Sequence, residues 1–248
     1  MDLGARLEGR HVLVTGASGG LGLHFARLCA GLGARVTLAA RRRERLDDLV
    51  AALPGSRAVG LDVADEASVE AAFAGFDAPP DVVVNNAGIA ESGAAIELPA
   101  ETFDRVVATN LRGVWLVSTA AARAWRAAGR GGAIVNVASI LGHRVAGAVA
   151  PYAVTKAGVV QMTAALALEW ARHGIRVNAL CPGYIATDIN TGFFETEAGQ
   201  AMLRRVPMRR LGRPEDLDGA FLLLATDASA WMTGASIAVD GGHLVSSL

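Results

Sequence analysis

Tyr152 and Lys156 stand four positions apart in the segment PYAVTK, directly after a loop of small residues. Both side chains normally titrate at about pH 10. Residues four apart lie on one face of a helix, so the two groups would point the same way. The pair is either two unrelated residues of a helix face or a lysine charge that makes the tyrosine a usable proton donor at neutral pH. The surrounding sequence distinguishes between these interpretations.

Short apolar strands and longer helices alternate along the chain. The strand patterns are β-branched and almost continuously apolar, which is typical of a parallel sheet covered on both faces. Seven such runs span residues 11–16, 35–40, 57–63, 81–88, 133–139, 175–183 and 235–242. Long helices are predicted over residues 99–128 and 152–172. Because no linker or repeat interrupts residues 1–248, we expect a single α/β domain with a doubly wound sheet.

Composition and charge exclude several classes of function. The 248 residues are 52% hydrophobic and carry a net charge of −1, so there is no basic excess for nucleic-acid binding. Because no run of about 18 apolar residues occurs, we expect no membrane-spanning helix. Charged residues interrupt the N-terminus where a signal peptide would be apolar. Cys29 and Cys181 are interpreted as buried free thiols, which fits a reducing compartment. We therefore expect a cytoplasmic protein, and the histidine spacing predicts no metal site.

Glycines dominate the turn TGASGGLG, which follows the first predicted strand and precedes a helix. Such glycines let the backbone turn tightly and approach a pyrophosphate, while the helix N-terminus offers free N–H groups and a positive dipole end. The alternative is a turn that serves packing only. Its place between strand and helix favours dinucleotide binding. The predicted contacts are Gly16, Ser18, Gly20, Leu21 and Gly22.

Arginines follow the second predicted strand, where dinucleotide-binding proteins contact the adenosine ribose. An acidic residue there binds a ribose 2′-hydroxyl, whereas a guanidinium suits a 2′-phosphate through charge-assisted bonds. We therefore predict NADP(H) rather than NAD(H), with Arg41 as the main contact and Arg42 as a helper. The alternative is that these arginines are only the solvated start of a surface helix. Candidate contacts at the next two strand ends are Asp62, which also fits a turn, Val63, Asn86, Ala87 and Gly88.

These motifs and four polar residues follow one another in a characteristic order. The order is TGASGGLG, NNAG, Asn110, Ser139, Tyr152-x-x-x-Lys156 and CPG. In this order and spacing, the chain resembles a short-chain dehydrogenase/reductase from residue 8 to about residue 242. Each motif alone is weak, but the combination is specific. The resemblance implies an enzyme with a Rossmann fold and the strand order 3-2-1-4-5-6-7.

The resemblance also implies a role for each polar residue. Tyr152 would be the general acid that protonates the carbonyl oxygen during reduction. Lys156 would lower the tyrosine pKa and hydrogen-bond the nicotinamide ribose. Ser139 would hold the substrate oxygen and stabilise its developing charge. Asn110 would anchor a water that links Lys156 to solvent.

Further implied contacts surround the nicotinamide and the substrate. Residues 188–210 correspond to a lid that closes over the substrate in such enzymes. Residues expected beside the nicotinamide are Pro182, Gly183, Ile185 and Thr187. Candidate substrate contacts are His143, Tyr184, Phe193 and Phe194, for which packing against the body is the alternative.

The implied reaction is the reversible NADP(H)-dependent reduction of a ketone to a secondary alcohol. The chain is most similar in appearance to 3-oxoacyl-thioester reductases and to sugar or polyol dehydrogenases. The resemblance implies a homotetramer, with the long helices in one interface and the C-terminal strand in another. NADP-preferring relatives often carry a basic residue at the position of Gly19, so NAD(H) use stays open. The alternatives are an NAD-preferring polyol dehydrogenase, a catalytically silent dinucleotide-sensing regulator, and a sugar-nucleotide epimerase, which usually needs a longer C-terminal region.

Overall fold

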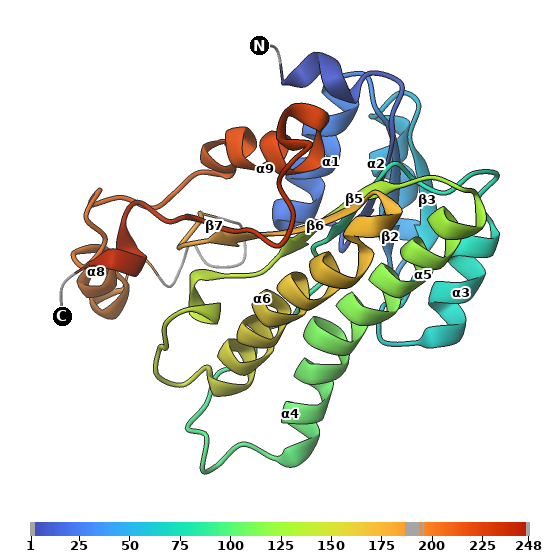
Figure 1. Cartoon of the computed structure of the whole chain (residues 1–248). Coiled ribbons are helices and arrows are strands. Elements are labelled where there is room, and N and C mark those ends of the chain that lie inside the picture. Colours follow the sequence, from blue (N-terminus) through green and yellow to red (C-terminus); the bar gives the residue numbers. More distant parts are fainter. Residues whose placement is uncertain (1–2, 187–193, 195, 247–248) are drawn as a thin grey trace.

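The computed structural model describes residues 3–186, 194 and 196–246. In this part of the chain, one parallel sheet has the strand order β3-β2-β1-β4-β5-β6-β7 (Figure 1). The order reverses between β1 and β4, and such a switch point opens a crevice at the carboxyl ends of the strands. The predicted fold and strand order are confirmed. The strands are β1 (His11–Thr15), β2 (Arg35–Ala40), β3 (Arg57–Gly60), β4 (Val82–Asn85), β5 (Gly132–Val137), β6 (Ile175–Pro182) and β7 (Ser236–Val239).

Helices cover both faces of the sheet (Figure 1). One face carries α1 (Gly20–Gly31), α2 (Glu44–Ala51) and α9 (Asp218–Ala225). The other carries α3 (Glu66–Ala74), α4 (Ala100–Val107), α5 (Gly113–Ala127) and α6 (Ala150–Trp170). A short helix, α8 (Glu197–Leu203), lies apart from these layers (Figure 1). Among the described helices, none combines the length and hydropathy of a membrane span.

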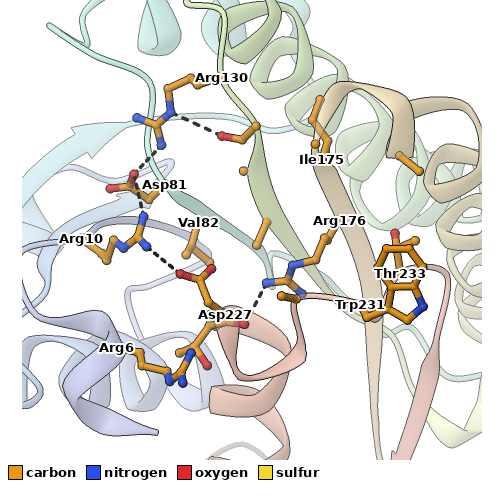
Figure 2. Close-up of a pocket in the computed structure, with 18 residues that line it drawn as sticks. Arg6, Arg10, Asp81, Val82, Arg130, Ile175, Arg176, Asp227, Trp231 and Thr233 are labelled. Atoms are coloured by element: carbon orange, nitrogen blue, oxygen red, sulfur yellow. Dashed lines mark hydrogen bonds and ion pairs between the residues drawn. The ribbon is translucent and has the colours of Figure 1, made fainter.

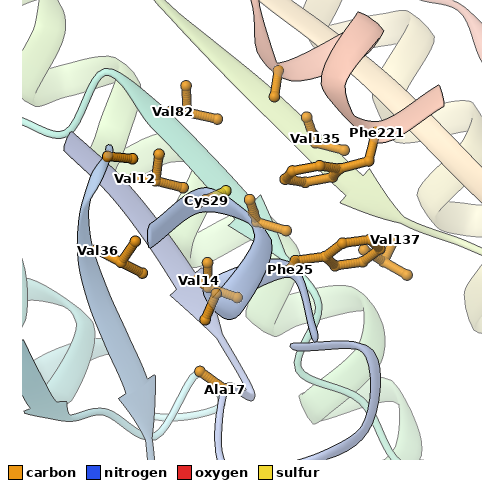
Figure 3. Close-up of a cluster of buried hydrophobic side chains, with 14 of the residues drawn as sticks. Val12, Val14, Ala17, Phe25, Cys29, Val36, Val82, Val135, Val137 and Phe221 are labelled. Atoms are coloured by element: carbon orange, nitrogen blue, oxygen red, sulfur yellow. The ribbon is translucent and has the colours of Figure 1, made fainter. Parts of the chain in front are cut away.

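Aromatic stacking joins α1 to α9 over one face of the sheet (Figure 3). The rings of Phe25 and Phe221 stack with their centroids 4.4 Å apart, and both side chains are fully buried. Val12 and Val14 of β1 pack in the same cluster, whereas Leu13 between them belongs to the cluster on the opposite face. Because both faces are covered, consecutive residues of β1 are apolar, which explains the nearly continuous hydrophobic strand.

Trp125 of α5 anchors the core on the opposite face. Its side chain is fully buried, and its indole N–H donates to the carbonyl oxygen of Pro80 at 2.6 Å. A Cβ added at Gly132 would lie 2.2 Å from the Trp125 ring, so the start of β5 requires glycine there. This packing fixes α5 beside the strands whose ends carry the polar residues predicted to be functional.

The helix predicted over residues 99–128 is not continuous. It consists of α4, a π-helical turn at Ala108–Arg112, and α5. A π-helical turn inserts one residue into the helical register and is frequent at functional sites. Asn110, one of the predicted catalytic residues, lies within this turn and is fully buried.

The third strand is shorter than predicted. The pattern indicated residues 57–63, but β3 ends at Gly60. Asp62 turns the chain, because its carboxylate accepts the N–H of Ala64 at 3.0 Å while its own N–H donates to the hydroxyl of Ser68 at 3.0 Å. Asp62 therefore lies beyond the strand end and faces the crevice.

Candidate active site

A cavity of about 930 Å³ opens at the carboxyl ends of the strands. This size is within the range of small-molecule and cofactor sites, roughly 300–1,000 Å³. The segments that follow β1 to β6 build its wall. It brings together most of the residues predicted for the cofactor, the reaction and the substrate, namely Gly16, Ser18, Gly20, Leu21, Arg41, Arg42, Asp62, Val63, Asn86, Ala87, Gly88, Ser139, Tyr152, Lys156, Pro182, Gly183, Tyr184, Ile185 and Phe194.

The turn after β1 is fastened to the turn after β4. Asn86 donates from Nδ2 to the carbonyl oxygens of Thr15 at 3.0 Å and Gly16 at 3.3 Å. The Thr15 hydroxyl accepts the N–H groups of Asn86 at 3.0 Å and Ala87 at 3.1 Å. Gly16 has a φ of +66°, and a Cβ there would lie 2.8 Å from the Ala87 Cα, so only glycine fits this close approach.

Gly22 differs from the other glycines of this turn, because it does not line the cavity. A Cβ added to it would lie 2.4 Å from both the Gly16 carbonyl oxygen and the Asn86 amide nitrogen. Gly22 is thus packed against the strand end, and its predicted contact with the cofactor stays a prediction. Gly22 lets α1 pack closely against the strand end.

The end of the cavity beside β2 is basic and open. Arg41 and Arg42 are both exposed, and within the described residues their guanidinium groups make no ion pair or hydrogen bond. The neighbouring Arg43 instead lies 3.9 Å from the Asp47 carboxylate and does not line the cavity. A Cβ added at Gly20 would meet nothing within 4 Å, so the backbone there faces open space. Open backbone and unpaired guanidinium groups together fit a dinucleotide with phosphate groups.

Ser139, Tyr152 and Lys156 converge at the other end of the cavity. Ser139 follows β5, and its hydroxyl accepts the N–H of Leu141 at 3.1 Å. The Ser139 side chain lies beside the Tyr152 phenol and acts to lower its pKa. Lys156 is buried one helical turn after Tyr152, with its Nζ 5.4 Å from the centre of the tyrosine ring. The Lys156 Nζ donates to the carbonyl oxygen of Val137 at 2.7 Å.

Burial controls the pKa of both titratable groups. It raises the pKa of Tyr152, and the nearby Ser139 hydroxyl only partly opposes this effect. It lowers the pKa of Lys156 to about 8. In this structure desolvation outweighs the expected effect of Lys156, whose ammonium is directed to the Val137 carbonyl, and the lowering of the tyrosine pKa by Lys156 stays a prediction. At neutral pH the phenol keeps its proton.

The Asn110 side chain is hydrogen-bonded to the segment that follows β4. Its Oδ1 accepts the N–H of Ile89 and its Nδ2 donates to the Ile89 carbonyl oxygen, each at 2.8 Å. Its Nδ2 also donates to the Thr155 hydroxyl at 3.3 Å. Asn110 does not line the cavity, and both ends of its amide are engaged, while its predicted role in anchoring a water stays a prediction. Asn110 links the NNAG turn to α6.

The predicted substrate contacts have different positions. The rings of Tyr184 and Phe194 meet edge to face, with centroids 5.7 Å apart, and both residues line the cavity. His143 does not line it, because its Nε2 is hydrogen-bonded to the Ser236 hydroxyl at 2.7 Å on the protein surface. The prediction for His143 is therefore not met. Thr187 and Phe193 lie outside the described residues.

Comparisons with known proteins agree with this geometry. A family model described as enoyl-(acyl carrier protein) reductase matches residues 16–243. The chain is 42% identical to L-rhamnose 1-dehydrogenase (NAD(P)(+)) of Azotobacter vinelandii, over 94% of this chain and 96% of the relative. It is 40% identical to galactitol 2-dehydrogenase (L-tagatose-forming) of Cereibacter sphaeroides, over 97% of each chain. The chain belongs to the short-chain dehydrogenase/reductase family.

A solved structure of this family superposes on almost the entire chain. It is a gluconate 5-dehydrogenase from Burkholderia cenocepacia in complex with NADP and tartrate, with a TM-score of 0.93 and 33% sequence identity. The match covers 99% of this chain and 100% of that chain. The chain is accordingly an NAD(P)-dependent short-chain dehydrogenase/reductase that acts on CH–OH groups.

Sequence analysis of this short-chain dehydrogenase/reductase missed a buried polar network that supports the site. The Asn85 Nδ2 donates to the Ser118 hydroxyl and to the Asn136 Oδ1, each at 2.9 Å. The Asn136 Nδ2 donates to the Thr163 hydroxyl at 2.9 Å. The network joins the ends of β4 and β5 to α5 and α6. Its signal in the sequence is an asparagine inside each of two apolar strand patterns, DVVVNNAG and AIVNVAS.

Proposed function

We propose that the chain interconverts a secondary alcohol and a ketone of a sugar, sugar acid or polyol, with NADP(H) as the hydride carrier. The observation that carries this proposal is the convergence of Ser139, Tyr152 and Lys156 at one end of a cavity that has Arg41 and Arg42 at its other end. A dinucleotide spanning the two ends would bring its nicotinamide beside the polar residues.

In the proposed mechanism, the bound dinucleotide supplies or accepts the hydride. Tyr152 donates its phenolic proton to the carbonyl oxygen during reduction and takes a proton back during oxidation. Ser139, which lines the same end of the cavity as Tyr152, stabilises the charge that develops on the same oxygen. Lys156 uses one of its three N–H groups on Val137 and keeps the others for a ligand in the cavity.

Two observations favour NADP(H) over NAD(H). No acidic residue ends β2, and Arg41 and Arg42 hold unpaired positive charge on the cavity wall. A 2′-phosphate would receive charge-assisted hydrogen bonds from these groups, whereas a 2′-hydroxyl would leave them without a partner. The gluconate 5-dehydrogenase that superposes on this chain was solved with NADP, which supports the same preference.

Similarity to characterised enzymes favours a polyhydroxylated substrate over a 3-oxoacyl thioester. The relatives that match almost the full chain are named for rhamnose and galactitol, and the solved neighbour for gluconate. Tyr184 and Ser92 add hydroxyl groups to the cavity wall, and Phe194 adds an apolar face. Such a mixed wall suits a sugar, which presents hydroxyl groups at its edges and C–H groups on its faces.

We also infer a homotetramer in which the long helices contact another subunit. Trp115 of α5 and both Val154 and Leu168 of α6 are exposed apolar side chains, and Leu168 is 84% exposed. Light scattering coupled to size-exclusion chromatography should give the mass of four chains. Leu168→Glu should reduce that mass, whereas a wild-type mass of one chain would contradict the inference.

The proposed function is tested by matched oxidation and reduction assays with NADP(H) and NAD(H). The substrate panel should contain aldoses, polyols, sugar acids, simple secondary alcohols and an acetoacetyl thioester. Turnover of a polyhydroxylated substrate, faster with NADP(H), is expected. Turnover of the thioester alone would contradict the substrate class. Cofactor binding without turnover of any substrate would favour the dinucleotide-sensing regulator.

A further inference from the structure

Another cavity, of about 560 Å³, lies at the opposite edge of the sheet from the candidate active site (Figure 2). Its wall includes the residues at the start of β4, β5 and β6, where the active-site cavity uses the ends of the same strands. The 3₁₀ turn η1 (Gly4–Leu7) and the loop between α9 and β7 complete the wall. Its volume is sufficient for a small metabolite.

The charged residues of this cavity are mostly arginines. Four guanidinium groups face two carboxylates, so the lining has an excess of two positive charges. They belong to Arg6, Arg10, Arg130 and Arg176, and the carboxylates to Asp81 and Asp227. In Figure 2, Arg10 lies between the two aspartates, and Arg130 approaches Asp81 from the other side.

Both carboxylates already have partners. Asp81 is hydrogen-bonded by Arg130, accepts the N–H of His11 at 2.7 Å, and lies 3.7 Å from Arg10. Asp227 accepts a hydrogen bond from Arg10 at 2.9 Å. These ion pairs account for two of the four guanidinium groups, and Asp227 attracts the nearby Arg176 without forming an ion pair with it among the described residues.

The other two arginines have no carboxylate partner in the described part of the chain. Arg176 donates only to neutral oxygens, which include the Thr226 carbonyl and the Ser229 hydroxyl, each at 3.0 Å. Burial lowers the pKa of its guanidinium, which means that the charged form is held at a cost in free energy. Arg6 makes no ion pair or side-chain hydrogen bond among the described residues, and it is partly buried in the wall. A bound anion would give both guanidinium groups a charged partner.

We propose that this cavity binds a small organic dianion, with a phosphate monoester or two carboxylate groups. Guanidinium groups bind phosphate and carboxylate oxygens through paired, charge-assisted hydrogen bonds. The fully exposed Trp231 stands at the rim, on the side away from Arg10 (Figure 2). Its indole face offers a stacking surface for the body of the ligand. Because this cavity and the active-site cavity lie at opposite edges of the sheet, the anion does not compete with the cofactor.

Calorimetric titration of the full-length protein, saturated with NADPH, tests the proposal. The probes are inorganic phosphate, glucose 6-phosphate and citrate. At least one should bind with one site per chain, and Arg6→Ala should weaken that binding at least tenfold. Arg126→Ala is the matched control, because Arg126 is an exposed arginine of α5 outside the cavity. Arg41→Ala separates this site from the phosphate end of the active-site cavity and should leave the binding unchanged.

Two results would overturn the proposal. One is the absence of binding by all three probes, and the other is binding that Arg41→Ala removes and Arg6→Ala preserves. If Arg6→Ala lowers the melting temperature, Arg6→Lys keeps the charge and should retain most of the affinity. Trp231→Ala should weaken glucose 6-phosphate and leave inorganic phosphate unchanged, which distinguishes stacking of the ligand body from attraction of the anion.

Discussion

Two charged side chains at opposite edges of the sheet, Asp81 and Lys156, have different kinds of partner. At the start of the strands, Asp81 is held by Arg130, Arg10 and the His11 N–H. Burial raises the pKa of Asp81, but these partners outweigh it and the pKa falls. At the strand ends, the buried Lys156 ammonium donates to the neutral Val137 carbonyl and has no carboxylate partner among the described residues, and burial lowers its pKa to about 8. Asp81 thus has charged partners that stabilise it, whereas Lys156 keeps N–H groups free for a ligand.

The buried Lys156 ammonium lowers the stability of the fold and is available for function. A buried ammonium without a counter-ion destabilises the fold below the pH at which it loses its proton. Such groups concentrate at functional sites. We therefore expect substitution of Lys156 to change catalysis more than stability, and substitution of His11 at the amino edge to do the reverse.

The largest effect is expected from Lys156→Met. We expect kcat to fall by about 100- to 1,000-fold, because a preorganised charge beside the reacting groups is lost. The folded lysine binds fewer protons than the unfolded one between about pH 8 and its ordinary pKa of 10.5, so wild-type stability rises with pH across this window relative to the variant. Steady-state assays and urea unfolding at pH 7 and pH ~9.5 measure both effects. An identical pH dependence of unfolding in the two proteins would contradict the buried, unpaired lysine.

Arg41→Ala should have the next largest effect, and it should be selective. Losing a charge-assisted contact to a 2′-phosphate costs about 1.5–3 kcal/mol, which corresponds to an increase of about 10- to 100-fold in KM for NADPH. The KM for NADH should stay nearly unchanged. Arg45→Ala is the matched control, because Arg45 is exposed and does not line the cavity. Equal losses with both cofactors would remove the case for NADP preference.

Asn110→Leu should have an intermediate effect on both properties. It leaves the N–H and the carbonyl oxygen of Ile89 without their partner, which costs roughly 1–3 kcal/mol of stability per unsatisfied buried group. Because the NNAG turn would shift, kcat should fall about tenfold, in line with the effect of small displacements on catalysis. Thermal unfolding and kcat measured on the same preparation test this coupling. A loss of kcat without loss of stability would point to a direct chemical role instead.

His11→Gln should have the smallest effect on activity. Burial, more than the nearby arginines, lowers the pKa of His11 to about 4. Between about pH 6.5 and pH 4, His11 is protonated in the unfolded chain but not in the folded chain. Wild-type stability therefore falls as the pH drops through this range. The glutamine variant should lose part of this pH dependence and keep the wild-type kcat at pH ~7.5. Unfolding curves that remain parallel across this range would show that His11 is not the responsible group.

Periodicity and motif order predicted the fold well, because they report which residues must be buried and where the chain must turn. The apolar strands of β1 and β4 and the glycines at their ends fixed the sheet and its crevice. The spacing of Tyr152 and Lys156 likewise predicts that both lie on one face of a helix, as they do in α6. The strength of these predictions comes from local geometry, which a sequence carries directly.

Side-chain partners could not be predicted in the same way, because they depend on contacts between distant elements. Nothing near Asn110 in the sequence indicates that its amide pairs with Ile89, and nothing near His143 indicates Ser236. The balance that raises the pKa of Tyr152 depends on burial by several elements. Likewise, the arginine-lined cavity at the amino edge combines residues from the first turn to the loop before β7.

The kcat of Tyr152→Phe, measured with NADPH and the best substrate of the panel, is the most direct test of whether Tyr152 is the general acid. Only the phenolic hydroxyl is removed, so the fold and the cofactor Kd should stay close to those of the wild type. We expect kcat to fall by about 100- to 10,000-fold, the range for a positioned general acid. A variant that retains most of its activity would show that the proton comes from elsewhere and would contradict the proposed mechanism.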